Sequence, residues 1–301
     1  MNRTALAVCA AALTGVQVGA AITATRYVAA DISPASLAFL RYAIGVACLV
    51  PAVALARRVR FARADIVPIA ALGIGQFGIL IALLNYGLRT VPAARGALIF
   101  AAFPLLTLVV AALLGHERVT TRKIIGILAT LFGVFLALSD KILNGVSIGG
   151  WSALTGELAI LASAATGAVC SVLYRPYLRR YPTLPVSAFA MAAAAAALVM
   201  PAALHDLLTA PAQLSPSAWA AIVFIGLSSG GGYVLWLWAL KNIAATRVTV
   251  FLALSPITAA ALGVVFLGET LTAGMMAGVV CVAAGLWVAG GEKPADKRLP
   301  S

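Results

Sequence analysis

The sequence predicts an all-α integral membrane protein whose ten transmembrane helices form two inverted five-helix repeats. The first observation is composition: 63% of the 301 residues are apolar, 10% are charged, and the mean hydropathy is +1.05. Soluble domains carry about 25% charged residues. The second observation is length, because a chain of this size accommodates about ten apolar helices of roughly 20 residues with short loops. The third is an internal duplication.

The duplication joins residues 93–139 to residues 245–291, which align without a gap at a constant offset of 152 residues. The matched residues include Pro104 with Pro256, Glu117 with Glu269, Gly126 with Gly278 and Gly133 with Gly285. We expect the prolines and glutamates to be structural residues near helix ends, where the carboxylates bind backbone amides or neighbouring arginines. Five spans per half is an odd number, so the second half enters the membrane from the opposite side and the repeat is inverted.

Ten apolar segments predict the spans in chain order. They cover residues 5–25, 34–55, 66–88, 93–114, 122–139, 154–174, 185–204, 217–239, 245–267 and 272–290. Pro34 and Pro185 open the second and seventh spans, where the missing N–H of proline costs nothing. An arginine-rich run at 57–60 closes the second span.

These spans group into two repeats. The first five-helix repeat is predicted over residues 1–140 and the second over residues 151–291. A polar connection at residues 141–150 joins them, and residues 292–301 form a tail. We expect the two repeats to form one structural unit, because each alone would expose a helix-packing face.

Lysine and arginine predict that both termini are cytoplasmic. With that orientation, 16 of the 21 Lys and Arg residues lie inside, as the positive-inside rule requires. The outward residues are Arg26, Arg41, Arg89, Arg95 and Lys141. Of these, Arg41 and Arg95 are expected near the outer surface. Membrane topology and anionic lipid headgroups therefore account for the net charge of +12, and no nucleic-acid partner is predicted.

Several other protein classes are disfavoured. Residues 1–24 have the basic start and apolar stretch of a signal peptide, but cleavage would leave four spans facing five. The four cysteines all lie within apolar spans and show no metal-ligand spacing. The chain has no phosphate loop, nucleophile elbow or paired histidines. We therefore predict no enzymatic activity, no cofactor and no metal site.

Matching glycine-rich segments in the third and eighth spans point to a binding site between the halves. Inverted repeats typify transporters whose substrate site lies near the membrane midplane, and glycine-interrupted helices mark it. Polar residues at this depth normally face the bundle interior or a wet cavity. The candidate substrate-binding residues are Gln17, Gln76, Tyr86, Ser228, Ser229, Tyr233 and Trp236. Two alternatives stay open: the glycines serve helix packing alone, and each polar residue only joins two helices.

The chain resembles the drug/metabolite transporter superfamily, and specifically its ten-helix EamA-type members. The resembling stretches are Ile32–Arg41, Leu84–Glu117, Gly126–Gly133 and Trp236–Gly285, which together with the repeat span almost the whole chain. Within the family it most resembles bacterial amino-acid exporters of the YddG type. The resemblance implies a helical carrier that works by alternating access, and many family members export metabolites.

The predicted function is therefore export of amino acids or similar small metabolites across the bacterial inner membrane. The solute enters a central cavity between the repeats, and the lipid bilayer is the other partner. The alternatives are a nucleotide-sugar transporter, a drug transporter and a lipid-handling membrane protein. Multidrug relatives rely on an acidic residue in the first helix, and this chain has none between Asn2 and Ala30. A nucleotide-sugar transporter requires basic residues deep in the cavity.

No acidic residue lies near the centre of a predicted span, although the chain has nine. Glu157, within one turn of the start of the sixth span, is the acid that a cavity mouth would most readily reach. Proton-coupled carriers place ionisable residues along the proton path. The sequence therefore predicts transport without an acidic proton carrier inside the membrane.

Overall fold

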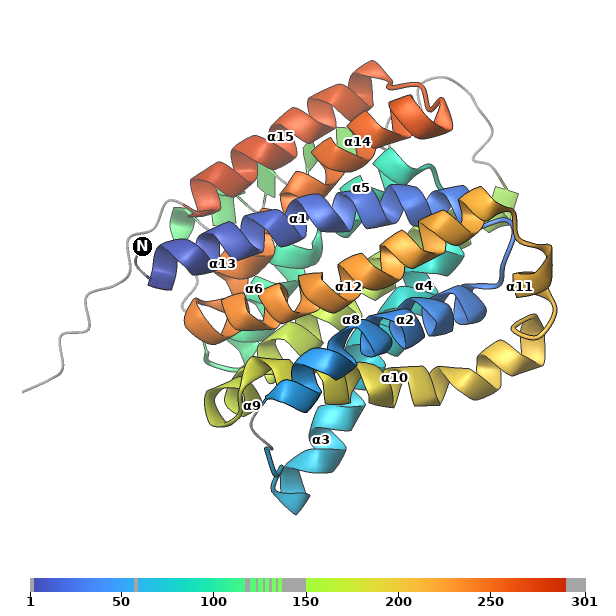
Figure 1. The fold of residues 1–301 in the computed structure, drawn as a ribbon. Helices are drawn as coiled ribbons and strands as arrows, with labels where there is room; N and C mark the ends of the chain where they lie inside the picture. Colours follow the sequence, from blue (N-terminus) through green and yellow to red (C-terminus); the bar gives the residue numbers. More distant parts are fainter. Residues whose placement is uncertain are drawn as a thin grey trace, which may run out of the picture.

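The structure is a computed structural model. It describes residues 3–56, 59–116 and 150–290, together with 120–122, 124–126, 128–129, 132–133 and 135–136. Every regular element in these residues is a helix (Figure 1). Glu117 lies outside the described residues, and the predicted fifth span lies partly outside them.

The first half contains α1 (Arg3–Val28), α2 (Pro34–Leu55), α3 (Arg63–Gly73), the π-helical turn η1 (Ile74–Ile79), α4 (Leu80–Gly87), α5 (Ala93–Phe100) and α6 (Phe103–Leu113). The second half contains α8 (Gly150–Leu173), α9 (Arg175–Arg180), α10 (Thr183–His205), α11 (Ala210–Gln213), α12 (Pro216–Asn242), α13 (Ala245–Val250), the 3₁₀ turn η2 (Phe251–Ala253), α14 (Leu254–Leu267) and α15 (Ala273–Gly290). Eight helical segments of the described chain are long and apolar enough to cross a membrane, and Ala273–Gly285 adds a shorter apolar helix.

The fourth and ninth spans are each broken at a matched position. The first break separates α5 from α6, and the second is η2 between α13 and α14. Pro104 lies in the first turn of α6 and Pro256 is the third residue of α14. A proline cannot donate to the carbonyl four residues before it and clashes with that group. The duplicated prolines therefore account for two discontinuous helices related by the repeat.

Helix contacts between the halves also come in matched pairs. The first span contacts the eighth through α1 and α12, and the sixth contacts the third through α8 and α4. Likewise α1 packs on α14 while α8 packs on α6, and α2 packs on α12 while α10 packs on α3 and η1. Exchanging the halves maps each contact onto its partner. This exchange is what a pseudo-two-fold axis produces, and it places the repeat interface at the centre of the bundle.

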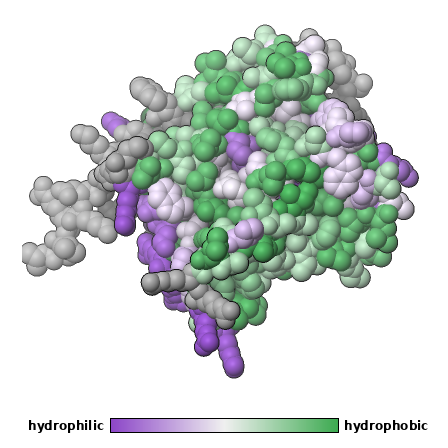
Figure 2. Space-filling view, in the orientation of Figure 1, coloured by the Kyte–Doolittle hydropathy of each residue, from purple (hydrophilic) through white to green (hydrophobic). Residues whose placement is uncertain are grey.

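The outer surface is largely apolar. Exposed side chains include Leu55, Val67, Leu113, Met200 and Val265. In Figure 2 hydrophobic residues cover most of the visible face, and hydrophilic residues gather near the ends of α3 and α9. Contiguous exposed apolar surface of this extent is unusual for a soluble monomer and suits contact with lipid.

Asp206 connects the second half to the start of α2 through hydrogen bonds. Its carboxylate accepts hydrogen bonds from the backbone N–H of Ser33 at 2.7 Å and from the hydroxyl of Ser36 at 2.6 Å. Partial burial raises the pKa of this carboxyl, but the hydrogen bonds from Ser33 and Ser36 outweigh it, so the pKa lies below its ordinary value. The charged carboxylate also complements the positive end of the α2 dipole.

Glu269 makes an equivalent contact between the halves. Its two carboxylate oxygens accept hydrogen bonds from the backbone N–H groups of Ala93, at 2.8 Å, and Ala94, at 3.3 Å. The sequence suggested that this carboxylate binds backbone amides or neighbouring arginines. In the structure it caps the start of α5, which belongs to the other half.

Candidate functional site

A cavity lies at the interface of the halves. It encloses about 530 Å³ of space, including its opening, and is lined by α1, α2, η1, α4, α5, α6, α12 and η2. Its polar lining residues are Thr14, Gln17, Arg41, Gln76, Tyr233 and Trp236. Both broken helices contribute to the wall. Phe100 and Leu252 line the cavity at the matched breaks of the fourth and ninth spans. Phe100 lies four residues before Pro104, and Leu252 lies four residues before Pro256.

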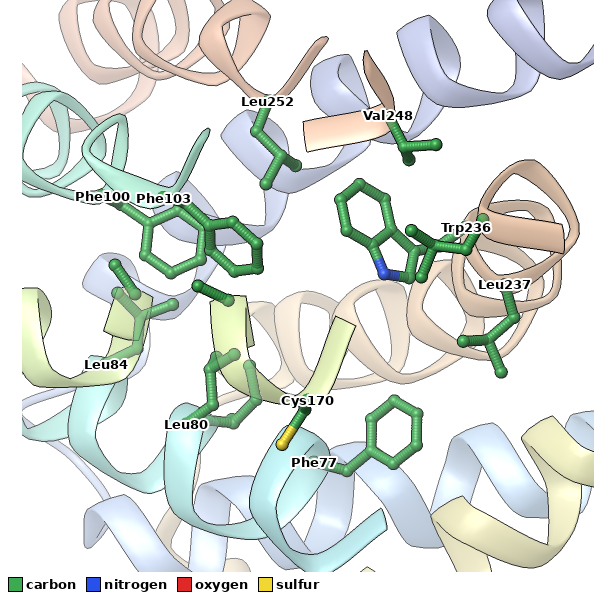
Figure 3. Close-up of a cluster of buried hydrophobic side chains, with 14 of the residues drawn as sticks. Phe77, Leu80, Leu84, Phe100, Phe103, Cys170, Trp236, Leu237, Val248 and Leu252 are labelled. Atoms are coloured by element: carbon green, nitrogen blue, oxygen red, sulfur yellow. The ribbon is translucent and has the colours of Figure 1, made fainter. Parts of the chain in front are cut away.

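One wall of the cavity is aromatic and aliphatic. Figure 3 shows Phe100 and Phe103 side by side, with the indole ring of Trp236 across from them and Leu252 nearby. The Trp236 ring meets Phe103 edge-on, with 6.1 Å between centroids, and Phe103 contacts Phe100 at 5.4 Å. Tilted and edge-on pairs of this kind stabilise rings by about 1 kcal/mol beyond their burial. The wall is therefore suited to an apolar or aromatic group of a solute.

Two neighbouring serines on α12 hold polar side chains of the opposite half. Ser229 accepts a hydrogen bond from Nε of Arg41 at 2.6 Å, and Ser228 accepts one from Nε2 of Gln17 at 3.2 Å. Both serine hydroxyls donate to the carbonyl of Ile225, at 3.1 Å for Ser228 and 2.6 Å for Ser229. The donated proton fixes each hydroxyl so that its lone pairs face the incoming N–H.

Gln76 lies in the π-helical turn η1 and is 3% exposed. Its side-chain oxygen has no hydrogen-bond partner in the described chain, and neither does the indole N–H of Trp236. A buried polar group without a partner costs about 1–3 kcal/mol. Both residues line the cavity. Single π turns of this kind frequently occur at functional sites.

The structure brings four of the sequence-predicted residues to the cavity wall: Gln17, Gln76, Tyr233 and Trp236. Ser228 and Ser229 do not line it, but each binds a residue that does. Tyr86 lies elsewhere, because 48% of its surface is exposed and it is absent from the lining. The prediction treated residues 66–88 as one α-helix, whereas the π-helical turn η1, which contains Gln76, changes the rotational phase of α4.

Arg41 was not among the predicted site residues, yet it is 5% exposed and lines the cavity. Sequence reasoning also missed Thr14, Phe100, Phe103 and Leu252. The signal available for the last three was the duplicated proline pair, because a proline break inside an apolar span opens backbone and side chains toward the centre. Arg95, by contrast, lies outside the lining and pairs with Glu157 at 3.8 Å.

The glycine run of α12 divides between packing and the cavity. Gly230 meets Gly45 of α2, because an added Cβ would lie 3.0 Å from the carbonyl oxygen of Gly45. Gly232 faces Gln17, whereas Gly231 has nothing within 4 Å of an added Cβ. Close helix approach through small residues is common in membrane bundles. Gly230 therefore serves close helix packing, whereas Gly232 lines the cavity.

Gly232→Ala is expected to weaken solute binding several-fold. The new Cβ would lie 2.6 Å from the side-chain oxygen of Gln17, so Gln17 must turn and strain or lose its bond to Ser228, at a cost of about 1 kcal/mol. Binding to purified protein measures the change. Gly231→Ala is the matched control, and it should bind solute normally. Equal binding by both variants would show that the Gln17 side of the cavity does not contact solute.

No group of three or more His, Cys, Asp or Glu side chains able to hold a metal occurs among the described residues. The described cavity lining holds one guanidinium, neutral hydrogen-bonding groups and an aromatic wall. It offers no nucleophile and base in contact within the described chain.

The comparisons with known proteins agree on the family. The model of the EamA-like transporter family matches the chain twice, at residues 5–139 and 154–291. An uncharacterized transporter of Archaeoglobus fulgidus is 26% identical over 90% of this chain and 93% of its own length. A protein of Streptantibioticus cattleyicolor named "probable terminal-alkyne amino-acid exporter" is 32% identical over 70% of this chain and 69% of its own.

The fold is also known from a crystal structure. That structure matches with a TM-score of 0.72 at 22% sequence identity, covering 96% of this chain and 98% of the other. At this identity the likeness concerns the fold alone. The two family matches, the helical architecture and the apolar spans together identify this chain as a member of the EamA-like transporter family, a multi-pass membrane transporter of the ten-helix drug/metabolite transporter fold and not an enzyme.

Proposed function

We propose that this protein exports amino acids or similar small metabolites by alternating access through the cavity between its halves. The observation that carries the proposal is the cavity wall, which combines a buried guanidinium, the neutral polar groups of Gln17 and Gln76, and an aromatic surface. A zwitterionic solute with an apolar side chain matches each of these groups. The name of the Streptantibioticus cattleyicolor relative, an amino-acid exporter, supports this solute class.

We propose further that the protein lies in the bacterial inner membrane with both termini cytoplasmic. The arginine-rich ends of α9 and the start of α3 then face the cytoplasm, together with most of the other cations. Residues 1–140 and 151–291 form the two moving halves. Alternating access would rock one against the other about the cavity, with the broken spans α5–α6 and α13–α14 as the deformable elements.

Counterflow into proteoliposomes tests the solute class. Proteoliposomes containing the purified protein are loaded with unlabelled amino acids in one batch and with unlabelled nucleotide sugars in another, and uptake of the matching labelled solutes is compared. We expect saturable exchange of at least one amino acid and none of the nucleotide sugars. Exchange of a nucleotide sugar without any amino acid would overturn the proposal. A reporter active only in the cytoplasm, fused after Ser301, tests the topology independently.

Nucleotide-sugar transport is the second candidate, because Arg41 places a basic residue in the cavity. The diphosphate group of a nucleotide sugar carries at least two negative charges, however, whereas the described lining holds a single cation. Buried charges need close compensation. The wall therefore fits a monoanionic group better than a diphosphate, and the exchange experiment separates the two.

Transport is expected to proceed without a proton gradient. The described cavity lining contains no carboxylate, and Glu157 instead pairs with Arg95 outside it. Glu157→Gln should therefore keep both counterflow and gradient-driven uptake within about two-fold of wild type, with the solute gradient as the driving force. Counterflow that survives in Glu157→Gln while pH-driven accumulation disappears would assign proton coupling to Glu157.

A further inference from the structure

We propose that Arg41 forms a carboxylate-binding subsite in the cavity, so that the protein selects solutes by an anionic carboxylate and discriminates against their amides and amines. The inference rests on the proposed function only in taking the cavity as the solute site. It adds the chemical group that the site recognises and the residue that recognises it.

Arg41 is a buried charge with no anionic partner in the described chain. It lies seven residues after Pro34, about 10 Å along α2 at 1.5 Å per residue, and is 5% exposed. No described carboxylate lies within ion-pair distance of it. An uncompensated charge at this depth is expensive, and such residues are normally paired or functional. A solute carboxylate would supply the missing charge when it enters.

The Arg41 guanidinium is hydrogen-bonded through Nε, whereas its two terminal nitrogens have no hydrogen-bond partner in the described chain. Its Nε donates to Ser229 Oγ at 2.6 Å, and Ser229 is itself anchored to the carbonyl of Ile225. The Tyr42 ring lies 5.7 Å from the guanidinium carbon. The paired N–H groups of the two terminal nitrogens match the two oxygens of a carboxylate, which is the geometry of a bidentate ion pair.

The rest of the lining suits the remainder of such a solute. The unpartnered side-chain oxygen of Gln76 offers an acceptor to an ammonium group, and the aromatic wall of Phe103 and Trp236 offers a surface for an apolar side chain. Arg41 is the one charged residue in the described lining. A cationic solute without a carboxylate would therefore meet a positive charge with nothing to offset it.

Equilibrium binding to purified protein tests the subsite with four probes of one shape. Phenylalanine is compared with phenylalaninamide, and 3-phenylpropionate with 2-phenylethylamine, since each pair differs at the carboxylate. Losing a hydrogen-bonded ion pair costs about 10- to 100-fold in affinity. We expect wild type to prefer phenylalanine over its amide by this factor, and 3-phenylpropionate over 2-phenylethylamine in the same sense.

Variants assign the preference to Arg41. Arg41→Gln should bind phenylalanine as weakly as the amide, and Arg41→Lys should keep part of the preference because it keeps the charge but not the fork. Arg95→Gln is the matched control, since Arg95 is also largely buried but lies outside the lining. It should keep the full preference.

The outcomes separate this inference from the proposed function. Equal binding of phenylalanine and its amide to wild type overturns the subsite and leaves amino-acid export standing; this comparison requires no variant to fold. A preference that persists in Arg41→Gln also overturns it. Binding of 3-phenylpropionate without phenylalanine supports the subsite, and the exchange experiment then decides amino-acid export. Binding of none of the four at millimolar concentration overturns the subsite.

Discussion

Gly15→Val is expected to remove most of the folded protein. Gly15 lies on the face of α1 that packs on the break between α13 and α14, where an added Cβ would overlap the backbone carbonyl of Phe251 and approach the Cβ of Leu254 to 3.3 Å. Backbone cannot swing aside as a side-chain tip does. Overpacking a tight interface costs about 1–3 kcal/mol or more. Separating α1 from η2 would also disturb the cavity, because both elements line it.

Detergent-solubilised yield and thermal unfolding measure this effect. Gly231→Val is the matched control, since it makes the same change within a transmembrane helix at a position with nothing within 4 Å of an added Cβ. The control should give near wild-type yield and melting temperature. If Gly15→Val matched the control in both, α1 would not pack against η2 as closely as the structure has it, and the repeat interface would need revision.

Much of the fold follows from sequence because the membrane limits the choices. Backbone polar groups in lipid must be satisfied within the segment, so an apolar run of about 20 residues implies a helix. The duplication then fixed the relation between the halves. The breaks within the spans at 93–114 and 245–267 were harder to predict, because an apolar run indicates a membrane span but does not show whether its helix is continuous. Pro104 and Pro256 were the residues that could have indicated the two breaks.

The site was predicted in part, for a different physical reason. Polarity at membrane depth indicated Gln17, Gln76 and Trp236, and all three line the cavity in the structure. Polarity does not show which neighbour a face meets, so Ser228 and Ser229 were expected to contact solute although they hold side chains of the other half. That choice depends on packing between spans distant in sequence.

Two predictions depended on premises that the sequence could not test. The prediction for Arg41 depended on a count of cations, and the prediction for Tyr86 depended on an uninterrupted α-helix. The positive-inside rule assigned Arg41 to the outer side of the membrane by counting cations. Such a count does not show that the Arg41 side chain enters the bundle and donates a hydrogen bond to Ser229 of another helix. Tyr86 was predicted as a substrate-binding residue on the premise that residues 66–88 form one regular helix. The π-helical turn at Ile74–Ile79 breaks that premise, and an apolar sequence gives little indication of such a turn.

Trp236→Ala is expected to lower solute affinity and transport by at least 10-fold. The indole is 2% exposed, meets Phe103 edge-on at 6.1 Å and lines the cavity. Removing it takes away both the apolar contact and an N–H group that is unpartnered in the described chain, losses on the order of 1 kcal/mol or more each. Trp236→Phe should retain part of the activity, because the ring contact with Phe103 remains.

Truncating a large buried side chain also costs stability, about 3–5 kcal/mol in a closed core, so the experiment must separate binding from folding. Trp238→Ala is the matched control: it makes the same change on α12 two residues away, where the side chain packs on the core but lies outside the cavity lining. Both variants should lower the melting temperature. Only Trp236→Ala should lose affinity in excess of that shift, measured as binding per folded molecule. If the two variants lost affinity equally, Trp236 would act through packing, and the solute would have to contact the Arg41 and Gln76 side of the cavity without it.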